Sequence, residues 1–267
     1  MNDKRTNNIA SGYKLSRRNF LQCVLATGIV SRWDDAKAIQ DDSILKRSIP
    51  STGETIPAVG LGTSDEFESA PEQSLDPLRE VLRRFVDLGG TLVDTAPVYG
   101  NAESVIGQLT NELSLTKQLF LATKVRTHGK QAGIEQMERS EQLLNKKPLD
   151  LLQVHSLVDV NTQLVNLRHW KDAGRVRYIG ITHSRVSGFA TLERLMQNET
   201  IDFVQLNYSF TEPDAERRLL PLAADKGIAV LANRPFQNGA MFRQVKGKSL
   251  PAWATDHSGR QRRRSWI

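Results

Sequence analysis

Four side chains that can hold or transfer a proton lie at, or just after, the carboxyl ends of three predicted strands. Asp94, Lys124 and His155 each stand where an apolar run stops, and Tyr99 lies in the loop just after Asp94. Side chains of these types carry out general acid–base catalysis. Taken singly, each has an ordinary structural explanation as a cap, a solvated cation, a core histidine or a packing ring. Their shared position at neighbouring strand ends favours the catalytic interpretation.

The segments that would position these side chains alternate between strand-like and helix-like patterns. The apolar runs predict strands near residues 58–61, 91–94, 119–124, 151–155, 178–182, 203–207 and 229–232. Apolar residues at three- and four-residue spacing predict helices near residues 75–88, 102–113, 134–144, 162–172, 188–197 and 214–225. Before them, two extended runs flank Ser51–Gly53, which predicts a hairpin.

This alternation predicts a parallel sheet, and seven units favour an α/β barrel over a doubly wound sheet. No Gly-x-Gly-x-x-Gly follows an early strand, which also argues against a dinucleotide-binding doubly wound fold. In a barrel the carboxyl ends of all strands face one mouth. We therefore expect Asp94, Tyr99, Lys124 and His155 to meet there.

Composition is that of one globular domain. The 267 residues are 39% hydrophobic and 25% charged, with a formal net charge of +6. Residues 1–38 hold seven Lys or Arg and three Asp, so most of the positive charge lies outside the predicted barrel. The barrel itself is near neutral, which argues against a nucleic-acid-binding surface. No segment reaches the length of a transmembrane helix, so we expect no stable membrane insertion.

Residues 1–38 have the pattern of an export signal. Paired Arg17 and Arg18 precede a short apolar run, and Ala36–Ala38 supplies the small residues of a cleavage site. This pattern resembles a twin-arginine signal and predicts the twin-arginine export machinery as a partner and the periplasm as the destination. The only cysteine, Cys23, lies inside this segment. The alternative is an ordinary basic N-terminus on a cytoplasmic enzyme.

A set of spaced motifs resembles the aldo-keto reductase superfamily, and more closely its exported, twin-arginine-carrying members. The motifs, between about residues 47 and 250, are IPAVGLGT, LVDTAPVYGNAE, LATKV, LDLLQVHS, GRVRYIGITHS, DFVQLNYS and VLANRPF. The resemblance implies a (β/α)8 TIM barrel closed at its bottom by an N-terminal β-hairpin. It also implies hydride transfer between a nicotinamide cofactor, NADPH rather than NADH, and a small aldehyde or ketone.

The resemblance implies a role for each of the four clustered side chains. Tyr99 would be the general acid that protonates the carbonyl oxygen. Lys124 would stabilise the phenolate and so lower the tyrosine pKa, and Asp94 would hold the lysine in place. His155 would hydrogen-bond the carbonyl oxygen and orient the substrate. No metal ligand set is expected.

The resemblance also implies cofactor contacts. Gln205 matches the glutamine that binds the nicotinamide amide, and Thr182 and His183 stand where many members have Ser and Asn. Asn233 stands where many members place an aromatic ring, so we expect that stacking to be replaced by neighbouring Arg234 or Phe236. The loop that contains Gly239 either offers backbone N–H groups to the pyrophosphate or is a plain turn.

The C-terminal segment departs from the family pattern. We expect a barrel domain over residues 39–253 and a basic, disordered tail over residues 254–267, with the eighth β/α unit missing. A reading-frame change near Ala254 would explain this, and the alternative is a short variant completed by a partner. Because an open barrel exposes strand edges, we expect weak cofactor binding and poor solubility. A non-catalytic or inactive reductase-like binding protein is therefore the alternative function.

Overall fold

The computed structural model describes residues 44–68 and 74–249, all within one compact unit, Ser43–Ile267. The predicted export signal (residues 1–38) and basic tail (residues 254–267) lie outside the described residues. Within the described part of the chain, no helix combines the length and the apolar character that crossing a membrane requires.

The predicted N-terminal hairpin is confirmed. Strand β1 (Lys46–Ser48) pairs antiparallel with β2 (Thr55–Pro57), and Gly53 takes a positive φ of 77° in the turn between them. The hairpin is tied to the sheet by Tyr178, whose hydroxyl donates to Glu54 over 2.5 Å. These contacts fix the hairpin across the end of the sheet opposite Asp94, Lys124 and His155.

The main sheet has seven parallel strands in sequential order, which confirms the predicted parallel topology. They are β3 (Leu61–Gly62), β4 (Leu92–Asp94), β5 (Phe120–Val125), β6 (Leu149–His155), β7 (Val176–His183), β8 (Phe203–Asn207) and β9 (Ala229–Asn233). The first of these lies about three residues later than the sequence predicts. It contains two residues, which pair with β4 at Leu61 opposite Val93 and Gly62 opposite Asp94.

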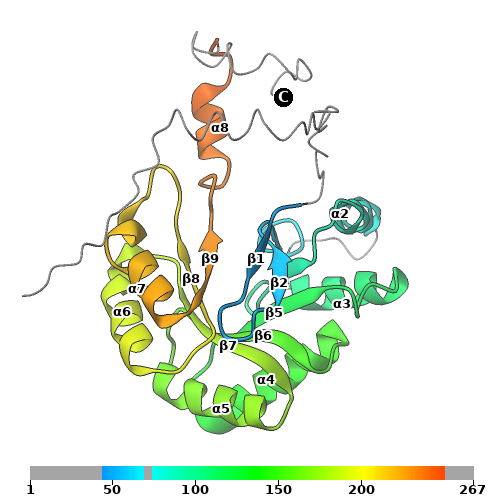
Figure 1. Cartoon of the computed structure of the whole chain (residues 1–267). Coiled ribbons are helices and arrows are strands. Elements are labelled where there is room, and N and C mark those ends of the chain that lie inside the picture. The colour runs from blue at the N-terminus through cyan, green and yellow to red at the C-terminus, as the bar shows by residue number, and fades with distance from the viewer. Residues whose placement is uncertain (1–43, 69–73, 250–267) are drawn as a thin grey trace, which may run out of the picture. The chain divides into compact units, whose positions relative to one another are not determined.

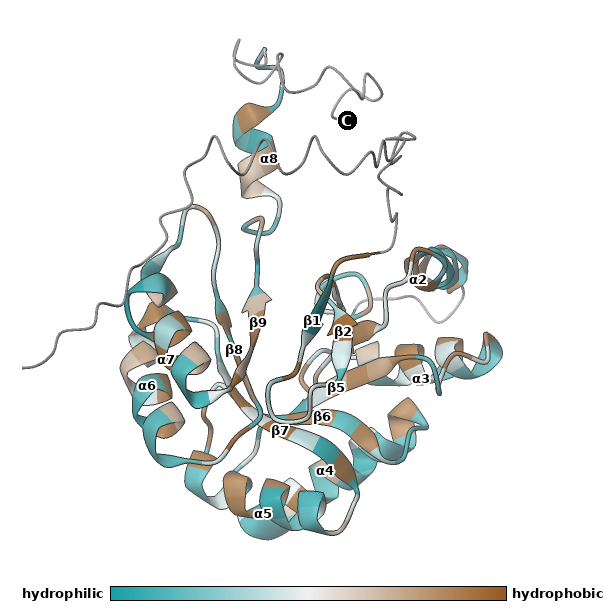
Figure 2. Ribbon diagram, viewed as in Figure 1, coloured by the Kyte–Doolittle hydropathy of each residue, from teal (hydrophilic) through white to brown (hydrophobic). Residues whose placement is uncertain are grey.

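Helices cover the outer face of this curled sheet (Figure 1). They are α2 (Asp76–Asp87), α3 (Ala102–Glu112), α4 (Lys130–Leu144), α5 (Val160–Asp172), α6 (Phe189–Asn198) and α7 (Leu219–Lys226), with two short 3-10 turns, η1 (Val186–Gly188) and η2 (Asp214–Arg217). Figure 2 shows the hydrophilic sides of these helices on the outside. Helix α8 (Ala240–Val245), which the sequence did not predict, projects beyond β9 and has no buried residue.

Two buried aspartates at the starts of strands help to fix the strand positions. A carboxylate oxygen of Asp150 accepts from the backbone N–H of Leu121 over 2.8 Å, and one of Asp202 accepts from that of Ile179 over 2.9 Å. Asp150 is the second residue of β6 and Asp202 directly precedes β8, and each bonds the backbone of the neighbouring strand that comes earlier in the chain. Because Leu121 lies three residues before Lys124, the Asp150 contact helps to set where the lysine falls along β5.

The core has two parts, one on each face of the sheet. The larger part lies between the strands and the helices, and the smaller part lies inside the curled sheet against the hairpin. The inner part contains Phe120, Tyr178 and Phe203, whose rings lie 5.6–6.1 Å apart between centroids, together with Ile49 of the hairpin. Apolar side chains therefore fill the amino-terminal end of the curled sheet, and the polar side chains lie at its carboxyl end.

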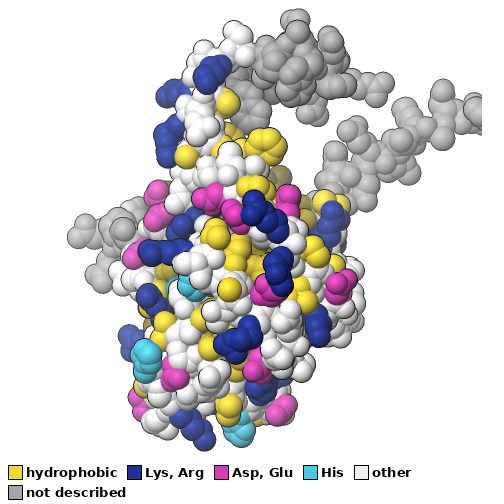
Figure 3. Space-filling view, turned by 90° about the vertical axis from the view of Figure 1, so that its left-hand side faces the viewer, with side chains coloured by type: hydrophobic (Ala, Val, Ile, Leu, Met, Phe, Trp, Pro, Cys, Tyr) yellow, Lys and Arg dark blue, Asp and Glu magenta, His cyan; other side chains and the backbone are white. Residues whose placement is uncertain are grey.

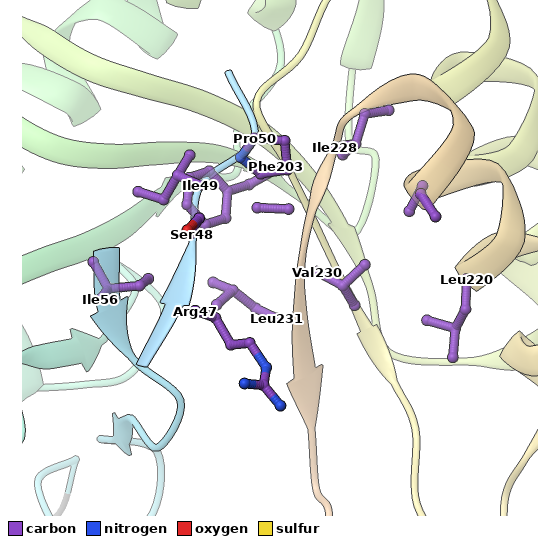
Figure 4. Close-up of a pocket in the computed structure, with 13 residues that line it drawn as sticks. Arg47, Ser48, Ile49, Pro50, Ile56, Phe203, Leu220, Ile228, Val230 and Leu231 are labelled. Carbon is purple, nitrogen blue, oxygen red and sulfur yellow. The ribbon is translucent and has the colours of Figure 1, made fainter. Parts of the chain in front are cut away.

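In the described residues the sheet does not close into a ring, which agrees with the expected absence of an eighth unit. Strands β3 and β9 each pair with one neighbour, and the side chains of β9 are half-buried or exposed where those of β8 are all buried. A cavity of about 390 Å³ lies between the hairpin and β9, lined by Ile49, Phe203 and Leu231 among others (Figure 4). Figure 3 shows hydrophobic side chains exposed among Lys and Arg on the face that carries α6 and α7.

Candidate active site

A buried ion pair lies at the carboxyl ends of β4 and β5. The Lys124 ammonium, 1% exposed, donates to both carboxylate oxygens of Asp94 over 2.9 and 2.8 Å and to the backbone carbonyl of Thr95 over 2.7 Å. These three bonds use all three N–H groups of the lysine. A buried ammonium without a partner would be costly, so the carboxylate both neutralises Lys124 and fixes its position.

Tyr99 and His155 adjoin this pair. The Lys124 nitrogen lies 5.1 Å from the centroid of the Tyr99 ring, and the rings of Tyr99 and His155 meet edge to face with centroids 5.9 Å apart. The four side chains that the sequence predicts to converge are therefore brought together at one strand-end cluster, which we call the tyrosine–lysine site (Asp94, Tyr99, Lys124 and His155).

The loop that carries Tyr99 is tied to the lysine strand through a second buried carboxyl group. Glu103, in the first turn of α3, accepts from the hydroxyl of Thr123 over 2.5 Å. Thr123 is the residue before Lys124, so this contact fixes the start of α3 against β5. Burial raises the pKa of Glu103, whereas its hydrogen bond with Thr123 lowers it in part.

His155 is held in its neutral form. Its pKa falls from 6.5 to about 3, first because burial disfavours the charged imidazolium and then because Lys124, Arg126 and His183 add positive charge nearby. Its buried Nδ1 has no hydrogen-bond partner among the described residues. A neutral imidazole has one N–H donor and one acceptor nitrogen, so it is suited to hydrogen-bond a neutral carbonyl group at physiological pH.

This low pKa predicts acid sensitivity. Between about pH 6.5 and pH 3 an unfolded chain protonates this histidine and the folded chain does not, so stability falls as the pH falls. We expect His155→Gln to reduce the loss of unfolding free energy between about pH 7 and pH 4.5, by at most about 1.4 kcal/mol per pH unit. Urea unfolding at several pH values measures this, and equal slopes in both proteins would contradict it.

A chain of side-chain amides crosses the inner face of the sheet beside the tyrosine–lysine site. The amide nitrogen of Gln153 donates to the Gln205 oxygen over 3.1 Å, and the Gln205 nitrogen donates to the Asn233 oxygen over 2.9 Å. Thr182 pairs in register with His155 on one side and Gln205 on the other, and its hydroxyl bonds none of the described residues. These groups can bind a carboxamide by complementary hydrogen bonds.

The other predicted cofactor residue on β7 has a different environment. The Nδ1 atom of His183 lies 3.0 Å from the Arg185 carbonyl oxygen and 3.2 Å from the Arg185 backbone N–H. A Cβ added at Gly188 would fall 2.2 Å from that nitrogen, so only glycine leaves room for the ring. His183 therefore packs against the η1 turn, while its strand neighbour Thr182 lies in register with Gln205.

The predicted residues after β9 are the most exposed. Phe236, 53% exposed, packs against Phe242 of α8 with ring centroids 5.0 Å apart, and Arg234 is exposed. Gly239 takes a φ of 77°, and its N–H donates to the Phe236 carbonyl over 3.0 Å. That N–H closes a turn, so this geometry favours the plain-turn alternative for the loop.

Two contributors to the site were missed by the sequence reasoning. Gln153 joins the amide chain, and the carbonyl of Thr95 binds Lys124. Gln153 stands two residues before His155, so the alternation of strand side chains would have placed both on one face. No sequence signal marks a backbone carbonyl. Among the described residues, no group of three or more His, Cys, Asp or Glu is placed to hold a metal ion.

Comparison with known proteins decides the family. The model of the family described as "Aldo/keto reductase family" matches residues 58–259. The chain belongs to the aldo/keto reductase family. Aldo-keto reductase YhdN of Bacillus subtilis is 31% identical over 209 residues, which cover 69% of this chain and 60% of YhdN. Methylglyoxal reductase YeaE of Escherichia coli is 28% identical, covering 77% of this chain and 79% of YeaE. The chain thus spans less than two thirds of YhdN.

Solved aldo-keto reductases share the fold. The thermostable reductase Tm1743, in complex with the inhibitor epalrestat, aligns with a TM-score of 0.66 at 24% identity, covering 80% of this chain and 81% of its own. The reductase AKR2E4 of Bombyx mori, in complex with NADP, aligns with a TM-score of 0.63 at 24% identity, covering 81% of this chain and 75% of AKR2E4. These alignments support the barrel architecture of this aldo/keto reductase family member.

Proposed function

We propose that this family member reduces an aldehyde or ketone to an alcohol with a reduced nicotinamide cofactor. The observation that carries the proposal is the buried Lys124–Asp94 pair, with its nitrogen 5.1 Å from the Tyr99 ring and His155 against that ring. Carbonyl reduction places negative charge on the oxygen and requires a proton there. The tyrosine–lysine site offers a proton donor, a fixed cation and a hydrogen-bond donor together.

Each residue has a distinct part in the proposed reaction. Tyr99 donates its phenolic proton to the carbonyl oxygen as negative charge develops there. Lys124, held by Asp94, stabilises the phenolate that remains. His155, neutral because of its low pKa, donates a hydrogen bond that orients the carbonyl. A bound nicotinamide cofactor would supply the hydride.

The amide chain is the proposed site for the nicotinamide carboxamide. Gln205 and Thr182 lie on the face of the sheet that holds His155, and the buried amide oxygen of Asn207 has no partner among the described residues. These polar groups suit a carboxamide ligand better than an apolar one. The proposal of NADPH rather than NADH is supported by complexes of other reductases, one from Bombyx mori with NADP and one from Klebsiella pneumoniae with NADPH.

The direct test is NADPH oxidation with a panel of aldehydes and ketones, together with identification of the alcohol product. We expect turnover that depends on both NADPH and a carbonyl compound. If NADPH binds but no carbonyl compound in a broad panel is reduced, the catalytic proposal is wrong.

The open sheet favours one second candidate, a non-catalytic binding protein. Among the described residues, strand β9, which carries Asn233, has a single neighbour and no fully buried side chain, so the cofactor side of the site is less rigidly supported than its catalytic side. Calorimetric titration with NADPH separates the candidates. Absence of NADPH binding by a folded chain would favour the second.

We also propose export by the twin-arginine route to the periplasm. The support is Arg17 and Arg18 before the apolar run and the small residues of Ala36–Ala38. Fractionation of cells that express the chain tests this. Substitution of both arginines by lysine should retain the protein in the cytoplasm, and unchanged distribution would contradict the proposal.

A further inference from the structure

Arg126 lies beside His155 at the carboxyl end of β5. Strands β5 and β6 pair Val125 opposite Val154, so Arg126 and His155 come next on adjacent strands. Side chains alternate between faces along a strand. Lys124 contacts Asp94 of the tyrosine–lysine site, and Val125 lies in the outer core. Continued alternation therefore places Arg126 on the same face of the sheet as Lys124, at the carboxyl end of the strands.

The guanidinium of Arg126 is free to bind a ligand. The residue is exposed, and no hydrogen bond or ion pair among the described residues engages its side chain; only its backbone N–H is used, donating to Gln136 over 2.6 Å. Some other arginines of this unit are paired, such as Arg175 with Glu141 over 2.5 Å and Arg177 with Asp150 over 2.8 Å. An arginine at the mouth is thus available where others are held by carboxylates.

The charges that act on His155 are all positive. Lys124, Arg126 and His183 each lower its pKa. Since the ammonium of Lys124 is already neutralised by Asp94, Arg126 is the cation next to His155 that lacks a partner in the described part of the chain. This field disfavours a cationic substrate and favours an anionic one.

We propose that Arg126 binds the carboxylate of the substrate, so that the substrates are small oxo acids or carboxylate-bearing aldehydes. The planar guanidinium offers two parallel N–H donors that match a carboxylate, while the carbonyl group of the same molecule reaches Tyr99 and His155. Arg126 directly follows β5, whereas the proposed carboxamide site spans β7 to β9, so the two ligands use different parts of the sheet. This assignment rests on the proposed reductase function.

The test compares a charged aldehyde with its uncharged isostere, 4-carboxybenzaldehyde and 4-formylbenzamide. We expect the wild-type chain to have the higher kcat/KM for the carboxylate. Arg126→Gln should lower kcat/KM for the carboxylate about 10- to 100-fold and change that for the amide less than about threefold. The kcat/KM of Arg126→Lys for the carboxylate should lie between those of the wild-type and Arg126→Gln chains, because lysine keeps the positive charge but lacks the two parallel N–H donors of the guanidinium. Lys130 is an exposed cation of the following helix, so Lys130→Gln is the matched control and should leave kcat/KM for both aldehydes unchanged.

Binding without turnover separates this proposal from the reductase function. Binding of 4-(hydroxymethyl)benzoate and 4-(hydroxymethyl)benzamide is compared by ligand-observed NMR in the wild-type and Arg126→Gln chains. A preference for the benzoate that disappears in the variant supports the carboxylate site even if no aldehyde is reduced. Equal binding of both compounds, or equal reduction of both aldehydes unaffected by the variant, would overturn it while leaving the reductase function standing.

Discussion

Replacing Tyr99 by Phe is expected to lower kcat/KM for carbonyl reduction by about 10²- to 10⁴-fold, the range that a general acid supplies. The substitution removes one hydroxyl and keeps the ring that packs edge to face against His155. The Lys124–Asp94 pair does not depend on that hydroxyl, since all three N–H groups of the lysine have other acceptors. Proton donation should therefore be lost with little change in the fold.

The measurement is steady-state reduction of an aldehyde, with NADPH affinity and thermal unfolding measured on the same samples. Tyr208→Phe is the matched control, because that hydroxyl donates to Glu216 over 2.6 Å and belongs to no part of the tyrosine–lysine site. We expect the control to keep its activity. Unchanged turnover by Tyr99→Phe would show that another group supplies the proton.

Replacing Lys124 by Met is expected to remove both activity and stability. The lysine is 1% exposed, and its loss leaves the Asp94 carboxylate, 15% exposed, without its cation. Breaking a buried ion pair from one side costs about 3–5 kcal/mol, a large part of the stability of a typical domain. Urea unfolding at neutral pH measures the loss, and aldehyde reduction measures the effect on catalysis.

The double variant Asp94→Asn with Lys124→Met separates the two effects. Removal of both charges should recover much of the lost unfolding free energy, because no uncompensated charge remains. It should not recover activity, because the cation that stabilises the tyrosine phenolate is still missing. A double variant that regains turnover would show that the ion pair serves the fold alone.

The periodicity of apolar residues predicted most of the fold. The helix expected over residues 102–113 spans Ala102–Glu112, and the strand expected over residues 203–207 spans Phe203–Asn207. The prediction failed where local pattern carries little information. β3 has two residues and begins later than predicted, and α8 forms after a turn at Gly239 in a stretch without helical periodicity.

The sequence likewise predicted some residues of the site and missed others. The strand-end positions of Asp94, Lys124 and His155 predicted their meeting, because parallel strands bring their carboxyl ends to one mouth. The same reasoning did not identify Gln153, two residues before His155 on β6, or Arg126, two residues after Lys124 and just past the end of β5. It did not predict that the His183 ring packs against Gly188, and the cofactor role of His183 stays a prediction.

By itself, the sequence determined the alternation of elements, the hairpin and the residue types at the strand ends, because these depend on patterns within short segments. Tertiary structure alone decided which atoms pair, namely the three acceptors around the Lys124 ammonium and the amide chain through Gln205, and that β9 has one strand neighbour among the described residues. It also decided that His155 is neutral, since that depends on burial and on cations from other strands. Burial and charge act through space, between residues that are far apart along the chain, and no local pattern encodes them.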